Sequence, residues 1–309
     1  MKEIKFITYN VDGLPETLDL NDLPWIFKPI VWIYKLITKT TIIRLNDNDN
    51  RSESSQFIGE RMKDDGIDII GLQEDFNYHN DISNGLGGKY VSNNHGGGFN
   101  LSKLFSTTEW LTYFPLPRFK CDGIGLFIND KIKILNEQFI RWEKSCGYFK
   151  HANDALTHKG FRYFSLAINN EIEMDVCVLH MDATFDLEDE RDLKARESQL
   201  KQLSKYIKSI NTDKPIVIMG DTNSYPHLNI DIKNVQENLI DSINEVPNLH
   251  ISEVVPNDGV FIDKFFIVNN DKSKHTLIPK ECYFDRTYNN SKIGIVSDHD
   301  PLIMALSVK

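Results

Sequence analysis

The sequence has few cysteines and no long hydrophobic run, and each absence excludes a class of protein. Its four cysteines, Cys121, Cys146, Cys177 and Cys282, are scattered and form no Cys-x-x-Cys pair. This excludes both a zinc site with paired cysteines and a disulfide-dense scaffold, and it favours free buried thiols. No stretch reaches the ~20 apolar residues of a membrane-spanning helix. No apolar region of a signal peptide follows Lys2, so we expect a cytoplasmic protein.

An excess of basic residues is also absent. The formal net charge is −10, so the chain has no broad basic surface that would bind a polyanion by charge alone. This disfavours a sequence-independent nucleic-acid binder, although a bound divalent cation can invert the local field. With 309 residues, 40% of them hydrophobic and 26% charged, the composition is that of an ordinary globular protein.

Apolar runs typical of buried strands recur along the chain. We predict strands at 4–11, 66–74, 123–130, 161–168, 173–182, 215–221 and 259–268, and a last apolar pair within 293–308. Several of these runs end in residues that a core does not favour, namely Asn10, Glu74, His180, Asp221 with Asn223, and Asp298 with His299. Asp263 lies inside another run.

These polar residues share a chemistry. Carboxylates and amides are hard oxygen ligands that suit magnesium or calcium, and manganese fits the same set. Strand ends gather at one rim of a sheet, where a rigid scaffold can hold a site. We therefore predict a divalent-metal site, with Mg²⁺ as the favoured cofactor, and histidines beside it for proton transfer.

Two helices follow from apolar spacing. Residues 188–210 place leucines and isoleucines at steps of three, four and seven, and residues 54–65 form a second helix. One of the three serines at 52–55 is the expected N-cap. Arg196 falls on the apolar face of the first helix, where its head either reaches water or is buried with a partner.

The segment 23–43 is aromatic and apolar, but its longest uncharged run is only Pro29 to Tyr34. Read as a helix beginning near Pro29, it places Lys35 and Lys39 in one stripe. One interpretation is a helix packed under the domain with its lysines reaching water. The other is an appendage that contacts a lipid surface.

Six blocks carry a resemblance to a known family. In chain order they are TYNVDGLPE, GLQED, LHMDA, GDTNS, FIDKFF and SDHDPL. They resemble the signature blocks of the endonuclease/exonuclease/phosphatase superfamily from about residue 5 to about residue 303. KARESQL after LHMDA, QEDFNYH, the Trp142–Gly147 stretch and KGF at 159–161 resemble the branch of neutral sphingomyelinases and related bacterial phosphodiesterases.

The resemblance implies an α/β fold, a two-sheet α/β sandwich with flanking helices. It implies one domain over 1–309, with an aromatic-rich insertion at about 23–45. It also implies a metal held by Glu74 with Asn10 beside it and Asp298 nearby. Asp12 matches only the apurinic-endonuclease form of the first block, so its role stays open.

The resemblance also assigns roles in phosphodiester cleavage. Asp221 and Asn223 would orient the attacking water and a phosphate oxygen, and His180 would stabilise phosphate charge. His299, oriented by Asp263, would act as general base or phosphate contact. Several relatives carry a cysteine where Ala155 stands, so Cys146 would lack a disulfide partner and secretion is not indicated.

Three functions remain to be compared. A magnesium-dependent phosphodiesterase acting on a phospholipid headgroup is favoured by the LHMDA block, the segment 23–43 with its possible membrane-surface contact, and the loop 93–105. A metal-dependent nuclease, or a nucleotide or inositol phosphate phosphoesterase, would use the same site. A non-enzymatic binding module is disfavoured by the intact acids and histidines. No obligate protein partner is evident.

Overall fold

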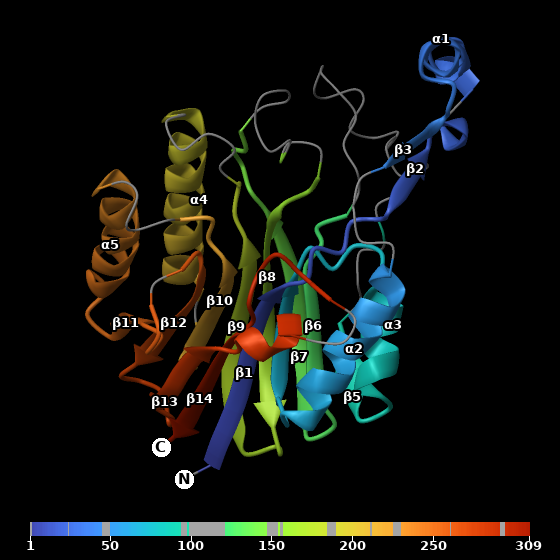
Figure 1. Cartoon of the computed structure of the whole chain (residues 1–309). Helices are drawn as coiled ribbons and strands as arrows, with labels where there is room; N and C mark the ends of the chain where they lie inside the picture. Colours follow the sequence, from blue (N-terminus) through green and yellow to red (C-terminus); the bar gives the residue numbers. More distant parts are fainter. Residues whose placement is uncertain are drawn as a thin grey trace.

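The computed structural model describes residues 2–23, 25–44, 50–93, 98, 121–146, 154, 157–183, 190–210, 212–224, 230–259, 261–290 and 294–309. The structure is built around two large mixed sheets that pack face to face, with helices on both outer sides (Figure 1). This arrangement confirms the predicted α/β sandwich. Ala155 and most of the loop 93–105 lie outside the described residues.

The first sheet has the strand order β13-β14-β1-β4-β6-β5. Its strands are β1 (Lys2–Asn10), β4 (Ile69–Gln73), β5 (Tyr90–Ser92), β6 (Gly125–Asn129), β13 (Leu277–Phe284) and β14 (Leu302–Val308). In its centre β1 runs parallel to β4 and antiparallel to β14. The pairing of Lys2 with Val308 places both chain termini at the end of the sheet opposite to Asn10.

The second sheet has the order β11-β12-β10-β9-β8-β7. Its strands are β7 (Ile132–Arg141), β8 (Gly160–Ile168), β9 (Ile172–His180), β10 (Ile216–Asp221), β11 (Leu249–Val254) and β12 (Asp263–Asn270). Here β9 and β10 are parallel. The strand predicted at 259–268 corresponds to β12, which begins at Asp263 and ends at Asn270, later than predicted at both ends.

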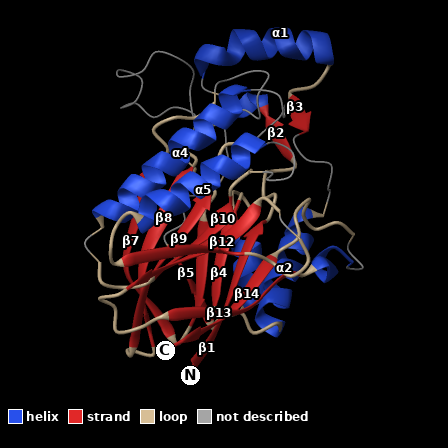
Figure 2. Ribbon diagram, turned by 90° about the vertical axis from the view of Figure 1, so that its left-hand side faces the viewer, coloured by secondary structure: helices blue, strands red, loops and turns tan. Residues whose placement is uncertain are grey.

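Helices cover both outer faces of the sandwich. On the first sheet lie α2 (Arg51–Asp64) and α3 (His79–Leu86), and on the second lie α4 (Glu190–Ser209) and α5 (Ile230–Asn244), as Figure 2 shows from the side of α4 and α5. Helix α4 matches the prediction closely. Helix α2 begins three residues earlier than predicted, after Asn50, which caps it without a side-chain hydrogen bond. The prediction of a serine N-cap was wrong, since all three serines lie inside the helix.

The layers explain why the central strands have apolar residues on both of their faces. In β1, Ile4 and Phe6 pack in the core between the sheets, whereas Ile7 and Tyr9 pack against α2. In β9, Val176 and Val178 face the core between the sheets, and Cys177 and Leu179 face α4. Because successive side chains point to opposite faces, a strand covered on both sides gains burial at every position.

A third, small sheet pairs β2 (Thr17–Asp19) with β3 (Ile42–Arg44) and carries α1 (Lys28–Thr38) between them. It stands away from the sandwich, and Val31 is the one buried residue of α1 (Figure 1). The interpretation of this segment as a helix packed under the domain was wrong. Among the described residues, no helix combines the length and hydropathy that crossing a membrane requires.

Candidate active site

Three neighbouring strands of the second sheet carry a row of titratable side chains at one end. His180 is the last residue of β9, Asp221 is the last of β10, and Asp263 is the first of β12. The register pairs Asp221 with His180 on one side and with Asp263 on the other. All three are buried. Paired residues on adjacent strands are close neighbours, so three apolar runs bring an imidazole and two carboxylates together.

The first sheet adds Asn10 and Glu74 to this row. Asn10 ends β1, and Glu74 follows β4, whose last residue pairs with Asn10 in parallel register. The Nδ2 of Asn10 donates to Glu74 Oε1 at 3.1 Å and to Asp221 Oδ2 at 3.2 Å. One amide thus joins the ends of both sheets and draws two carboxylates toward the same point.

The backbone at this rim is unusual. Asp12, Glu74 and Asn223 have positive φ values of 46°, 55° and 49°, three of the six such non-glycine residues in the described chain. A left-handed conformation costs an L-residue roughly 1–2 kcal/mol. Hydrogen bonds hold it: Gly13 N donates to Glu74 O at 3.0 Å, and Asn223 N donates to Asp221 Oδ1 at 2.8 Å. Such outliers are concentrated at functional sites, where the surrounding structure maintains them.

His299 reaches the row from the loop that precedes β14. Its Nδ1 lies 2.8 Å from Asp263 Oδ2, and its Nε2 lies 3.8 Å from Asp221 Oδ2. Ser297 fixes this loop, since its hydroxyl donates to Asn10 O at 2.7 Å and accepts from His299 N at 3.2 Å. Burial disfavours the imidazolium, but the charge and hydrogen bond of Asp263, with the charge of Asp221, raise the pKa of His299 to about 10.

His180 has the opposite electrostatics. Burial, together with the positive charges of Lys159 and His299, lowers the pKa of His180 well below its ordinary value. The Lys159 Nζ lies 3.0 Å from His180 Nε2 and donates to Met181 O at 3.2 Å. His180 is therefore neutral, and its Nε2 accepts from the ammonium. Its Nε2 also lies 3.7 Å from Asp221 Oδ2 and 3.9 Å from Glu74 Oε1.

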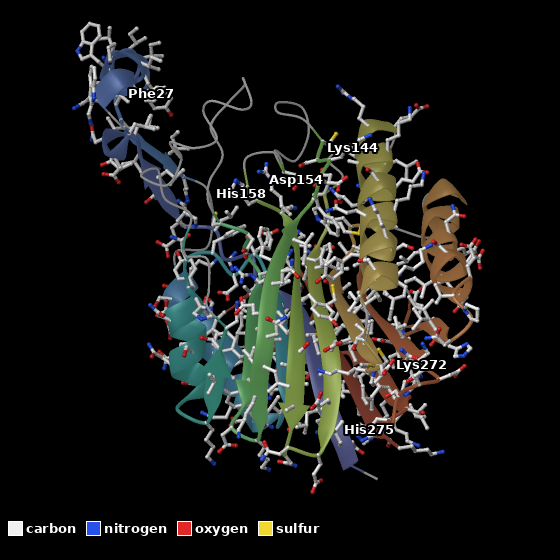
Figure 3. The ribbon with its side chains drawn as sticks, turned by 180° about the vertical axis from the view of Figure 1, so that it is seen from behind. Phe27, Lys144, Asp154, His158, Lys272 and His275 are labelled. Carbon is white, nitrogen blue, oxygen red and sulfur yellow. The ribbon has the colours of Figure 1, made fainter. Side chains whose placement is uncertain are left out.

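Lys159 was not among the candidates that the sequence indicated. It is buried and ion-paired with Asp154, and Figure 3 shows Asp154 at the same end of the strands as His158, opposite to His275. Burial lowers the pKa of Lys159, but the charges of Asp154 and Glu74 outweigh it, so the net shift is upward. Burial and Asp154 raise the pKa of Asp182 to about 7. In the sequence, only the KGF block at 159–161 pointed to Lys159, and this block contains no acid or histidine that would suggest a site.

The remaining predicted residues lie around this centre. Asn223 is buried and donates from Nδ2 to Met181 O at 3.1 Å. Asp298 is exposed, and its charge contributes to the raised pKa of His299. Asp12 forms an ion pair with the buried Arg51, which also donates to Val296 O at 2.8 Å. Arg196 is buried and donates to Asp182 O at 3.2 Å, which is the second of its two predicted arrangements.

Comparisons with solved structures identify the fold. D. rerio TDP2 complexed with a single-strand DNA product superposes with a TM-score of 0.60, at 12% identity over 99% of this chain and 100% of that chain. The endonuclease/exonuclease/phosphatase from Bacteroides vulgatus gives a TM-score of 0.59, at 15% identity over 100% of both chains. The chain has the endonuclease/exonuclease/phosphatase fold. No family model matches the sequence, and the curated proteins gave no match.

Another structure with this endonuclease/exonuclease/phosphatase fold contains a metal. A mutant beta toxin from Staphylococcus aureus with bound magnesium ions has a TM-score of 0.56, at 15% identity over 98% of this chain and 99% of that chain. In the described part of the present chain, Asp221, Asp263 and His299 each bring a ligand atom within 4.8 Å of the others. This group is suitable for a cation only when His299 is deprotonated, because an imidazolium has no free lone pair.

Glu74 and Asn10 offer a second donor set that needs no deprotonated histidine. The Glu74 carboxylate is partly exposed, with 24% of its side chain accessible, whereas the Asp221 carboxylate behind it is buried. The Asn10 Nδ2 donates to both carboxylates, so the only Asn10 side-chain atom that could bind a metal is Oδ1, which accepts from Asp12 N at 3.1 Å. Carboxylate and amide oxygens are the ligands that magnesium prefers. The residues present therefore fit a hard divalent cation at the Glu74 side of the site.

Proposed function

We propose that the protein is a magnesium-dependent phosphodiesterase that hydrolyses a phospholipid headgroup in the manner of sphingomyelinases. The observation that carries the proposal is the junction of Asn10 with Glu74 and Asp221, flanked by a neutral and a cationic histidine. Phosphodiester cleavage needs positive charge at the phosphate, a base for the attacking water and an acid for the leaving oxygen. All three kinds of group lie together at this junction, at one end of the two sheets.

Glu74 and Asn10 would hold the metal, with Asp298 contributing from the exposed loop beside them. A bound magnesium ion would supply Lewis-acid stabilisation of the negative charge that develops on the phosphate. The partial exposure of Glu74 leaves room for a substrate to approach from solvent.

The proton chemistry belongs to Asp221 and His299. Burial and the charge of Asp263 raise the pKa of Asp221 to about 6, close to that of an efficient general base at neutral pH. In the proposed step, Asp221 takes a proton from the attacking water while the His299 imidazolium protonates the leaving oxygen. Transfer of the proton from Asp221 to His299 Nε2, 3.8 Å away, then restores both groups.

His180 and Asn223 position rather than transfer protons in this scheme. The Asn223 backbone N–H holds Asp221 Oδ1 at 2.8 Å and leaves Oδ2 directed toward the histidines. The neutral His180 accepts from the Lys159 ammonium and so holds that positive charge at the rim. This supports a contact between a phosphate oxygen and the Lys159 ammonium, the positive group of the His180–Lys159 pair.

The choice of a lipid substrate is supported by the motif resemblance to neutral sphingomyelinases and by the exposed apolar segment around α1. A nuclease is the alternative, since TDP2 with bound single-strand DNA shares the fold. The net charge of −10 disfavours it, because backbone binding of nucleic acid relies on cationic side chains.

A hydrolysis panel tests the proposal. Purified protein is assayed on sphingomyelin, phosphatidylcholine, inositol phosphates and plasmid DNA, each with magnesium or with a chelator. We expect magnesium-dependent release of the phosphorylated headgroup from a choline lipid and no nicking of the plasmid. Nicking without lipid cleavage would replace the lipid substrate with nucleic acid. Inactivity toward every phosphodiester would contradict the proposed function itself.

A further inference from the structure

Residues 17–44 form an arm that stands away from the sandwich. The arm consists of β2, α1 and β3, and its base is closed by the β2–β3 ladder. Four leucines anchor this base against Phe76 and Cys121: Leu14, Leu18, Leu20 and Leu23. Figures 1 and 2 show α1 beyond the end of the sheets that is opposite to the two termini. In Figure 3, Phe27 marks the arm from behind.

The arm is unusually apolar for an exposed element. Seven of the thirteen exposed large hydrophobic residues in the described chain lie on it: Trp25, Ile30, Trp32, Ile33, Leu36, Ile37 and Ile42. Trp25 is 81% exposed, Ile37 is 74% exposed and Trp32 is 65% exposed. An apolar surface of this extent on one element marks an interaction site rather than scattered surface residues.

The charges on α1 are separated from its apolar face. Lys28 and Lys35 are seven residues apart and share one stripe. Ile30, Ile33 and Ile37 are spaced by three and four and lie on the opposite side. The helix is therefore amphipathic, and its apolar side faces solvent.

The charge of the arm is opposite to that of the molecule. Residues 17–44 contain four basic residues, Lys28, Lys35, Lys39 and Arg44, and two acidic ones, Asp19 and Asp22, which gives the arm a net charge of +2 within a chain of net charge −10. Basic residues combined with tryptophan on an amphipathic helix are the composition that binds anionic lipid at the membrane interface. A second copy of the same cationic arm would be repelled, so charge favours a lipid surface over self-association.

The arm also begins and ends beside the site. Asp12 lies five residues before the arm and Arg51 lies seven residues after it, and these two residues form an ion pair. Arg51 donates to Val296 O, in the loop that carries His299. The segments before and after the arm are thus joined to each other and to the loop that carries His299.

We propose that this arm docks the protein on an anionic phospholipid surface, with α1 lying in the interface and the site facing the headgroups. With eleven residues α1 is roughly 16 Å long, about half of the hydrocarbon core, so it lies on the surface rather than spanning it. The catalytic consequence of docking rests on the proposed function, but docking itself does not.

Vesicle binding without turnover tests the inference. Wild-type protein is sedimented with phosphatidylcholine vesicles, with and without phosphatidylserine, in the presence of a chelator. We expect binding that requires phosphatidylserine and weakens with salt. The double variant Trp32→Ser, Ile37→Ser should bind at least about tenfold more weakly. Its matched control, Val91→Ser with Leu135→Ser, removes two exposed apolar residues outside the arm and should bind like wild type.

A fluorescent label reports insertion independently of a mutant's folding. All four native cysteines are buried, so Ile37→Cys offers one accessible thiol for a polarity-sensitive dye, and Leu135→Cys is the matched control. We expect a blue shift on phosphatidylserine vesicles for position 37 and none for position 135. No shift at position 37, or unchanged sedimentation of the double variant, would overturn the inference. Concentration-dependent dimerisation that the double variant abolishes would replace lipid with a second copy.

Hydrolysis of a soluble phosphodiester separates the two proposals. The arm variants should retain the wild-type rate on bis-p-nitrophenyl phosphate and lose rate on vesicle lipid. If wild type binds vesicles but cleaves no phosphodiester, the docking inference stands and the proposed function fails. If it cleaves the soluble substrate but ignores vesicles, the docking inference fails alone.

Discussion

His180 and His299 lie on either side of the Asp221 carboxylate, 3.7 and 3.8 Å from its Oδ2. They differ in charge because their other neighbours differ. His299 has the Asp263 carboxylate at 2.8 Å, whereas His180 has the Lys159 ammonium at 3.0 Å. A neighbouring anion stabilises an imidazolium and a neighbouring cation destabilises it. At neutral pH the site therefore contains one cationic and one neutral imidazole.

Histidine NMR titration in a chelator measures this asymmetry. We expect a His180 pKa well below the ordinary value, so that this ring is neutral at neutral pH, and a cationic His299 with a pKa of about 10. Asp263→Asn removes the anion that holds the proton, so the pKa of His299 should fall toward ~6.5. Because the His299 imidazolium is lost once the pH exceeds its pKa, activity that needs this cation should disappear at a lower pH in Asp263→Asn than in wild type. Equal His299 titrations in wild type and variant would contradict this account.

The sequence predicted the residue types at this site better than their protonation states. Asn10, Glu74 and Asp221 could be identified because each follows an apolar run that gains nothing from a polar end. Lys159 and Asp182 could not be identified, because lysines and acids beside a strand are common in ordinary loops and do not mark a site. The protonation of His299 depends on Asp263, 36 residues away, and only the fold brings the two together.

Strand burial explains which elements the sequence could predict. β1, β9 and β10 are buried on both faces and appear as continuous apolar runs. β7 and β13 have many exposed positions and were missed. The start of α2 was misplaced because Arg51, which local pattern assigns to a loop, is drawn into the helix and buried by its contacts with Asp12 and Val296.

Gly220 supports the element that carries Asp221. Its φ is +147°, and a Cβ there would lie 2.0 Å from Leu179 O on β9. Gly220→Ala must therefore separate β9 from β10 next to His180 and Asp221. We expect a loss of about 3 kcal/mol or more in the free energy of unfolding, with loss of activity.

Gly66→Ala is the matched control for that substitution. Gly66 also has a positive φ, of +66°, but nothing lies within 4 Å of its Cβ position. Only the backbone conformation then opposes the substitution, at roughly 1 kcal/mol. Urea denaturation of both variants measures the difference. Equal losses at Gly66 and Gly220 would mean that the β9–β10 contact does not constrain the site.

At the scale of the whole molecule, the two-sheet sandwich was predicted through the resemblance of six sequence blocks to a known superfamily, and the apolar strand pattern alone did not specify it. The sequence left the segment 23–43 undecided, because one amphipathic pattern describes both a packed helix and an exposed one. The resemblance predicted flanking helices, and the structure identifies them as α2, α3, α4 and α5, with α1 on a separate arm. The apolar face of α1 is therefore exposed.

The central claim is that Glu74 holds a divalent metal for phosphodiester hydrolysis, and a magnesium titration of bis-p-nitrophenyl phosphate hydrolysis tests it most directly. Wild type should show a saturable magnesium dependence and no activity in a chelator. Glu74→Gln should lower turnover at least about a hundredfold and require more magnesium, with unchanged melting. Glu281→Gln, an exposed glutamate on β13, should behave as wild type. Full activity of Glu74→Gln at limiting magnesium, or of wild type in a chelator, would contradict the account.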